Sequence, residues 1–165
     1  MLTLAAAIVV SFLEGTAFRG DAPLAVGAEL ARGDRVRTGE GSRLEIEFPG
    51  GTVVRLGEKT DFTVNDVPGE KAGRRWSLGL ALGNLWAKVV GLAGGRFEVE
   101  TENAVAGVRG TEFRVEVSDG EEVVRVYEGE VELRQRVREG TPAWARTLRA
   151  LHELRLHRGR PGDLR

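Results

Sequence analysis

The stretch Glu112–Val117 reads EFRVEV, and Ser118-Asp119-Gly120 follows it directly, a combination of residues that favours a tight turn. Charged and apolar residues alternate through this stretch, and a period of two places the apolar side chains on one face of a β-strand. Arg43–Phe48 (RLEIEF) alternates in the same way and ends at Pro49-Gly50-Gly51, after which Thr52–Leu56 begins another strand. The two strands flank either a hairpin turn or the corner of a solenoid.

The same alternation continues on both sides of these stretches. It recurs in Phe97–Thr101, in Val123–Val126 and in Glu130–Arg134, and no window before residue 140 sustains a helical stripe of apolar residues. We therefore predict an all-β fold of about ten to twelve short strands, arranged as a solenoid-like or sandwich-like stack, with at most one short C-terminal helix.

A weak internal repeat supports a stack. A turn glycine followed by an outward and then an inward residue occurs at Gly15, Gly83 and Gly129, with a looser copy at Pro49–Val53. The spacing of these glycines is too irregular for a strict solenoid period. Repeated β-turn-β units on a shared core would still produce this pattern.

Composition indicates a globular protein. The 165 residues carry a formal net charge of −1, with 41% hydrophobic and 30% charged residues. The chain has no Cys, which excludes disulfides, thiolate metal sites and thiol nucleophiles. Residues 1–133 hold 15 Lys and Arg against 22 Asp and Glu, whereas residues 134–165 hold nine Arg against three acidic residues. A basic tail either docks on its own acidic body or contacts anionic partners.

Three segments follow from these patterns. The apolar stretch at the N-terminus is too short to span a bilayer, and no Lys or Arg precedes it as in a complete signal peptide. We therefore interpret residues 1–7 as either the remnant of an export signal or the start of the first strand. Residues 8–134 form the β domain, and residues 135–165 form an Arg-rich extension that packs on it. Within the extension, Thr141-Pro142 resembles a helix start, whereas residues 148–157 also read as two strands, which we favour.

Three ordered motifs resemble the FecR-like domain family. They are Leu30–Gly39 (LARGDRVRTG) with Gly51–Gly57 after it, then Thr101–Val115 (TENAVAGVRGTEFRV), and finally Tyr127–Val131 (YEGEV). Pro49-Gly50 and Glu102 depart from the family pattern at turn positions. The motif residues for which the resemblance implies a structural or partner-binding role are Gly33, Asp34, Thr38, Gly51, Thr101, Ala104, Val108, Arg109, Gly110, Thr111, Phe113, Glu128 and Gly129.

The resemblance implies an exported, solenoid-like module in the periplasm or at the cell surface, with an incomplete export signal in this sequence. Family members relay signals in the cell envelope, so we expect a protein partner and a sensing or scaffold role. The anti-sigma role of the best-known members does not carry over, because this sequence shows neither their transmembrane helix nor their cytoplasmic segment. We expect no membrane span and no nucleic-acid partner; the oligomeric state is left open.

No residue pattern indicates an enzyme. His152 and His157 share a face on neither a helix nor a strand, no Ser lies in a Gly-x-Ser-x-Gly elbow, and residues 91–96 lack the Lys of a phosphate loop. We therefore expect no cofactor and no metal. The alternative function is a carbohydrate- or peptidoglycan-binding envelope domain that uses Trp76 or Trp144, since Trp86 alternates with Leu85 and is expected in the core.

Arg109 stands between Val108 and Gly110 at the entrance of a strand. Its guanidinium can satisfy free carbonyls at a corner or pair with a carboxylate such as Asp34, or it can project outward to receive a partner's carboxylate. We favour the structural role, because buried backbone acceptors at a turn must be satisfied.

Overall fold

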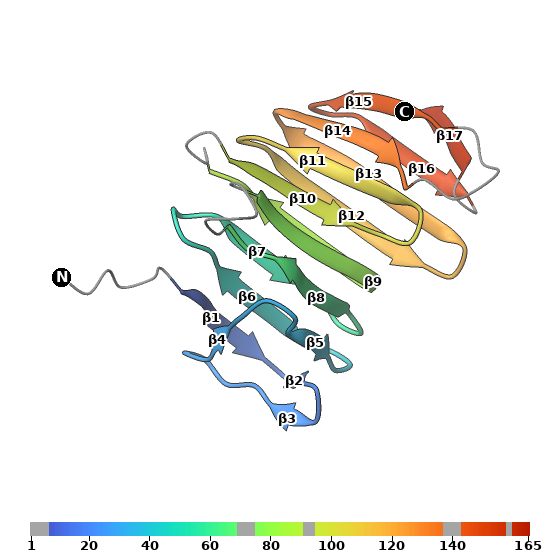
Figure 1. Ribbon diagram of the computed structural model, residues 1–165. Helices are drawn as coiled ribbons and strands as arrows, with labels where there is room; N and C mark the ends of the chain where they lie inside the picture. The colour runs from blue at the N-terminus through green and yellow to red at the C-terminus, as the bar shows by residue number, and fades with distance from the viewer. Residues whose placement is uncertain (1–6, 69–74, 91–94, 137–142, 158–159) are drawn as a thin grey trace.

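The computed structural model describes residues 7–68, 75–90, 95–136, 143–157 and 160–165, and all of its regular elements are strands (Figure 1). The prediction of an all-β fold is confirmed. Seventeen strands replace the expected ten to twelve, because several of them contain only two or three residues. In this part of the chain there is no helix, and so none that is long and apolar enough to cross a membrane.

The strands are β1 (Ile8–Glu14), β2 (Ala17–Arg19), β3 (Ala22–Pro23), β4 (Glu29–Leu30), β5 (Arg35–Thr38), β6 (Arg43–Glu47), β7 (Val53–Leu56), β8 (Asp61–Asp66), β9 (Arg75–Lys88), β10 (Arg96–Glu100), β11 (Ala104–Val108), β12 (Glu112–Ser118), β13 (Glu121–Glu128), β14 (Glu130–Gln135), β15 (Ala145–Arg149), β16 (Glu153–His157) and β17 (Arg160–Leu164).

The strands form two layers, which we call sheet A and sheet B. Sheet A has the order β4-β1-β6-β7-β9-β12-β13-β16-β17, and sheet B has the order β3-β2-β5-β8-β9-β10-β11-β14-β15. Figure 1 shows them stacked side by side from β3 and β4 at one end to β15, β16 and β17 at the other. The fold therefore combines the two facing layers of a sandwich with the level-by-level progression of a solenoid.

The 14-residue strand β9 belongs to both layers. Its first part pairs with β8 and β10 in sheet B, and from Gly83 onward it pairs with β7 and β12 in sheet A. Each layer contributes alternate apolar residues to one core, in which Phe62, Phe97 and Phe113 are fully buried. The alternation of charged and apolar residues in the sequence thus corresponds to an outer and an inner face of each layer.

The chain passes from one layer to the other at corners with positive φ. In the N-terminal half the corners lie at one edge of the stack, and they are Gly15, Gly41, Lys59 and Gly83. The registers of β1, β6, β7 and β9 place these four positions next to one another along that edge. In the C-terminal half, Gly110, Gly129 and Leu151 make the corners at the opposite edge. The change of edge follows β9, which explains why β9 and β10 are parallel whereas every other described pair is antiparallel.

Three of the four expected repeat glycines are therefore equivalent. Gly15, Gly83 and Gly129 all have φ between 80° and 94° and all lie where the chain changes layer. The fourth copy is different: Gly50 and Gly51 lie in a hairpin turn between β6 and β7, which are neighbours in sheet A. The open choice between hairpin and corner at this position is thus decided for the hairpin.

The C-terminal segment continues both layers. Strand β15 pairs with β14 in sheet B, and β16 pairs with β13 in sheet A, so that Leu148 and Leu154 are fully buried. The strand reading of residues 148–157 is the one that the structure adopts, with Leu151 at the corner. Thr141 and Pro142, the expected helix start, lie outside the described residues, as do residues 1–6 of the expected export signal.

Candidate functional site

The family-motif residues do not converge on one site but are distributed along the two edges and the core. Ala104, Val108 and Phe113 are buried in the core, whereas Glu128 is exposed. Gly33 has a φ of +89° and donates its N–H to Val64. The buried members of the set thus belong to the architecture, whereas Glu128 is open to solvent, and the set brings no reactive groups together within the described residues.

Buried hydroxyl groups satisfy the corners of the N-terminal half. The Oγ1 of Thr38 donates to the carbonyl of Gly57 at 2.6 Å and accepts the N–H of Thr60 at 2.9 Å. The Oγ1 of Thr60 accepts in turn the N–H of Asn84 at 3.1 Å. At the Gly15 corner the hydroxyl of Ser42 accepts the N–H of Thr16 at 2.8 Å, so a buried hydroxyl links adjacent levels where the backbone turns away from the strand ladder.

The second motif builds the equivalent corner at the other edge. Thr111 is 2% exposed, and its Oγ1 donates to the carbonyl of Glu130 at 2.9 Å. Gly129 has a φ of +82°, and a Cβ there would lie 3.0 Å from the carbonyl oxygen of Gly110. The corners Gly110 and Gly129 therefore pack directly on each other, and only glycine fits at position 129.

Thr101 organises the turn between β10 and β11 together with a residue that the sequence did not reveal. Its Oγ1 accepts the N–H of Ala104 at 3.0 Å and donates to the carboxylate of Glu122 at 2.6 Å. Glu122 is 3% exposed, and it also accepts a hydrogen bond from the Asn103 side chain at 2.8 Å. The sequence signal for it is its parity, because Glu122 occupies an inward position of β13, two residues before the buried Val124.

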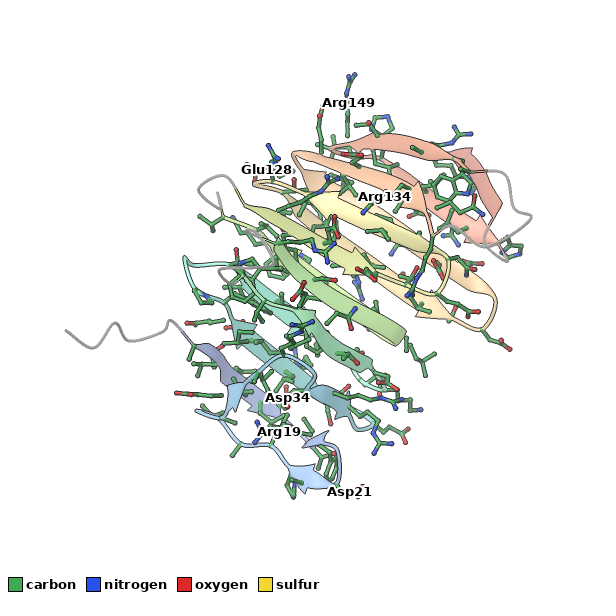
Figure 2. The ribbon with its side chains drawn as sticks, viewed as in Figure 1. Arg19, Asp21, Asp34, Glu128, Arg134 and Arg149 are labelled. Atoms are coloured by element: carbon green, nitrogen blue, oxygen red, sulfur yellow. The ribbon has the colours of Figure 1, made fainter. Side chains whose placement is uncertain are left out.

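The structural role expected of Arg109 is wrong. Its side chain is exposed, and it makes no hydrogen bond or ion pair with any residue that the structure describes. Asp34, its expected carboxylate partner, lies near the N-terminal end of the stack, where it accepts the N–H of Ala31 and pairs with Arg19 (Figure 2). The hydroxyl of Thr111 satisfies the neighbouring corner instead, so no guanidinium is needed there.

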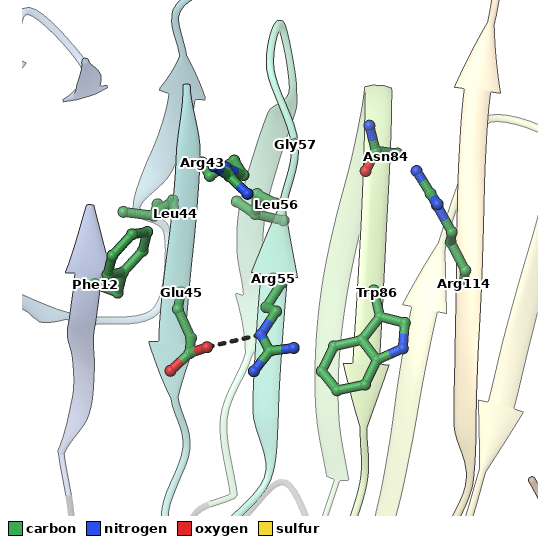
Figure 3. Close-up of a pocket in the computed structure, with 10 residues that line it drawn as sticks. All are labelled: Phe12, Arg43, Leu44, Glu45, Arg55, Leu56, Gly57, Asn84, Trp86 and Arg114. Carbon is green, nitrogen blue, oxygen red and sulfur yellow. Dashed lines mark hydrogen bonds and ion pairs between the residues drawn. The ribbon is translucent and has the colours of Figure 1, made fainter. Parts of the chain in front are cut away.

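The outer face of sheet A carries a groove of about 480 Å³ whose lining includes Phe12, Trp86 and Arg114 (Figure 3). The strand registers place Phe12 opposite Glu45, Glu45 opposite Arg55, and Arg55 opposite Trp86. Trp86 is in turn opposite Arg114 of β12. Side chains from five adjacent strands therefore form one continuous row across the sheet, because directly opposite residues in antiparallel strands share a face.

Trp86 is not in the core, contrary to the expectation. Leu85 takes the inward position and is fully buried, whereas Trp86 is half-buried on the outer face. The Arg55 guanidinium carbon lies 4.7 Å from the centre of the indole ring, and the Trp86 Nε1 donates to Glu112 at 3.2 Å. The indole is therefore held in place by a cation–π contact and one hydrogen bond.

The other two tryptophans are packed on the core. Trp76 makes an edge-on contact with Phe48, with ring centres 5.4 Å apart, and Trp144 also packs against core residues. Both rings are half-buried, and Trp144 also lines an open cavity of about 500 Å³ beside Arg134, so the carbohydrate-binding alternative keeps Trp144 as a candidate side chain.

Most charges on the outer faces are paired across strands. Arg125 bonds both Glu116 and Glu153, and Arg155 also bonds Glu153. Burial would raise the pKa of Glu153, but the hydrogen bonds from the two arginines outweigh it, so this pKa lies below its usual value. Glu98, which is 2% exposed, lies among Arg75, Arg96 and Arg134. These networks pair strands rather than bind a substrate.

No catalytic or metal-binding group is visible in the part of the chain that the structure describes. No three His, Asp or Glu residues gather there as metal ligands would. His152 contacts the carbonyl of Ala150, and His157 lies beside Glu121. Residues 91–94 of the glycine-rich stretch are outside the described residues.

Comparison with solved structures identifies the same fold elsewhere. Two crystal structures of a candidate anti-sigma factor from Parabacteroides distasonis ATCC 8503 have TM-scores of 0.64 and 0.63 with this chain, at 22% sequence identity. Each alignment covers 79% of this chain and 57% of the solved chain, so the chain spans a little over half the length of these neighbours. A search of curated proteins finds no match.

The sequence itself matches the family described as FecR protein over residues 34–132, which is more than half of the chain. The match includes the corner threonines Thr38 and Thr111, the turn residue Thr101 and the corner glycine Gly129. The family and the fold thus agree with the resemblance carried by the three motifs, and the chain belongs to the FecR protein family.

Proposed function

We propose that this chain is a non-catalytic signal module that acts outside the cytoplasm and binds a protein partner in the cell envelope. Membership of the FecR family supports a signalling role. The observation that carries the proposal is that Thr38, Thr101 and Thr111 are all buried in corners and turns. Their hydroxyls bond the backbone and Glu122, so function is left to the exposed faces of the two sheets.

The solved neighbours are named for an anti-sigma role, which we do not extend to this chain, because it covers 57% of their length. What we propose for it is the sensing part of such a system. The sequence has no Cys, and this is compatible with export, since a domain of this size folds without disulfides when it has a sufficient core.

The absence of Cys also provides a direct test of location. Asp119 is exposed in the turn between β12 and β13, so we expect an Asp119→Cys variant to fold and to react with a membrane-impermeant maleimide. The variant is expressed from its own gene, and cells are labelled after the outer membrane alone has been permeabilised. Labelling before the inner membrane is broken supports the proposal, and labelling only after complete lysis contradicts it.

Two controls make the labelling interpretable. The parent chain has no thiol and gives the background. A Val115→Cys variant places the thiol at a position that is fully buried in β12, so it reacts only in unfolded chains. Equal labelling of the Asp119 and Val115 variants would show that the signal comes from unfolded protein.

A further inference from the structure

We propose that the groove on the outer face of sheet A, between Phe12 and Arg114, is the docking site for an acidic segment of the partner protein that also carries an aromatic or large apolar side chain. This inference rests on the proposed function and deepens it, because it names the surface and the chemistry of the partner. Figure 3 shows Trp86 between Arg55 and Arg114, with Phe12 on the strand at the far side of the groove.

The position of Phe12 is the first argument. Ile8 and Val10 point into the core, and strict alternation would bury Phe12 as well. The register of β1 against β6 instead shifts between Val10 and Phe12, and this β-bulge turns Phe12 outward, where it is 48% exposed. A bulge that directs a large aromatic side chain into water gives up core burial, and bulges commonly redirect side chains at binding sites.

The composition of the groove is the second argument. Phe12 and Trp86 lie within one row with Arg55 and Arg114, and Arg43 lines the same groove. Aromatic and arginine side chains are enriched at the centres of protein–protein interfaces, where they supply most of the binding energy. This composition favours a protein as the occupant.

Charge is the third argument. The groove is lined by three arginines, Arg43, Arg55 and Arg114, against one acidic residue, Glu45. Each arginine has one carboxylate partner, Glu14 for Arg43, Glu45 for Arg55 and Glu116 for Arg114, but the Arg43 and Arg55 side chains are still 72% and 60% exposed and so remain accessible. Exposed guanidinium groups with remaining N–H donors can bond the carboxylates of a docked acidic segment, and such complementary charge accelerates association.

The floor of the groove adds a polar anchor. Gly57 has no side chain, and the carboxamide of Asn84 lies over it, so closely that a Cβ on Gly57 would be 2.3 Å from the Asn84 amide nitrogen. That carboxamide makes no hydrogen bond to any other described residue. It is therefore free to donate to a backbone carbonyl or a carboxylate of the docked segment.

The first test measures binding to named probes. We expect a random copolymer of glutamate and tyrosine to bind more tightly than poly-glutamate, because it supplies both carboxylates and aromatic rings. Phe12→Ser and Arg114→Ala should each weaken binding of the copolymer about tenfold, as the loss of a side chain that contributes clearly to an interface does. The matched controls are Phe18→Ser and Arg37→Ala, exposed positions on the outer face of sheet B, which should bind like the parent.

Three results would overturn the proposal. The first is a parent chain that does not bind the copolymer, and the second is an equal loss of binding in the sheet A variants and their sheet B controls. The third is tighter binding of polygalacturonate with the same dependence on Phe12 and Arg114, which would assign the groove to a carboxylated glycan. Circular dichroism melting of every variant confirms that the fold is retained.

The second test separates the groove from the proposed function. A photo-reactive phenylalanine analogue replaces Phe12 or Phe18 in cells that make the full chain. Cross-linking of a protein from position 12, abolished by Arg114→Ala and absent from position 18, supports the groove. Cross-linking from position 18 alone would leave the protein-binding function standing and place its site on sheet B.

Discussion

Replacing Gly83 by alanine is expected to destabilise the fold more than replacing any exposed turn glycine. Gly83 is the point at which β9 passes from sheet B to sheet A, and its φ is +94°. A Cβ at this position would lie 2.5 Å from the backbone Cα of Thr60 and 2.3 Å from its hydroxyl oxygen. The added methyl group therefore forces two adjacent levels of the stack apart.

The expected loss has three parts. A non-glycine residue with positive φ costs roughly 1–2 kcal/mol. Overpacking at a site that cannot relax costs about 1–3 kcal/mol, and here the obstacle includes the backbone. Displacing Thr60 also weakens its hydrogen bond from the N–H of Asn84, for about 0.5–1.5 kcal/mol. We therefore expect Gly83→Ala to lower the free energy of unfolding by roughly 3–6 kcal/mol.

The matched control is Gly120→Ala. Gly120 has a φ of +72°, but a Cβ there would meet nothing within 4 Å, so this variant pays only the conformational cost of about 1–2 kcal/mol. Urea titration followed by circular dichroism at the β-sheet band gives both free energies of unfolding. If Gly83→Ala is no less stable than Gly120→Ala, the close contact between the two corners is not real and the reasoning fails.

Three further predictions concern single side chains. Thr101→Val should cost about 1–3 kcal/mol in urea titration, because the buried carboxylate of Glu122 loses a donor and the turn loses its cap; an unchanged free energy would mean that the turn holds without the hydroxyl. Arg109→Ala should change the unfolding free energy by less than about 0.5 kcal/mol, because its side chain is exposed and unpaired among the described residues; a larger loss would restore a structural role. Glu153→Gln should be less stable than the parent at neutral pH, since arginines lower the pKa of this carboxyl in the folded state. The stabilisation by the Glu153 carboxylate is present above the unfolded-state pKa and is lost as pH falls through the folded-state pKa. The difference in melting temperature between parent and variant should therefore vanish in acid. A difference that does not change with pH would contradict this prediction.

The corner residues show how far the motifs alone can be interpreted. Glycine at positions 83 and 129 is understandable from the sequence as a turn, but the reason that alanine cannot replace it lies in Thr60 and Gly110, residues of neighbouring levels. The same holds for Arg109, whose position between glycines gave it an apparent structural role. Only the structure shows that the corner is already satisfied by Thr111.

Phe12 and Trp86 show a different limit. A period of two predicts which side chains share a face, and strict alternation from Val10 would put Phe12 on the inner face of β1. One bulged residue in β1 reverses the parity after it, and local sequence contains no signal for that shift, because it depends on the pairing of β1 with β6. For Trp86, alternation with Leu85 fixed that the two residues face opposite sides, but not which of them faces the core.

The sequence by itself determined the all-β class, the approximate positions of most strands and the family, because alternation and turn glycines are local properties of the chain. The tertiary structure alone decided that the strands form two layers joined through β9, that the corners change edge after it, and that Phe12, Trp86 and Arg114 meet in one groove. These features depend on which strands become neighbours across long separations in the sequence. That choice is made by the collective burial of one shared core, not by any single segment.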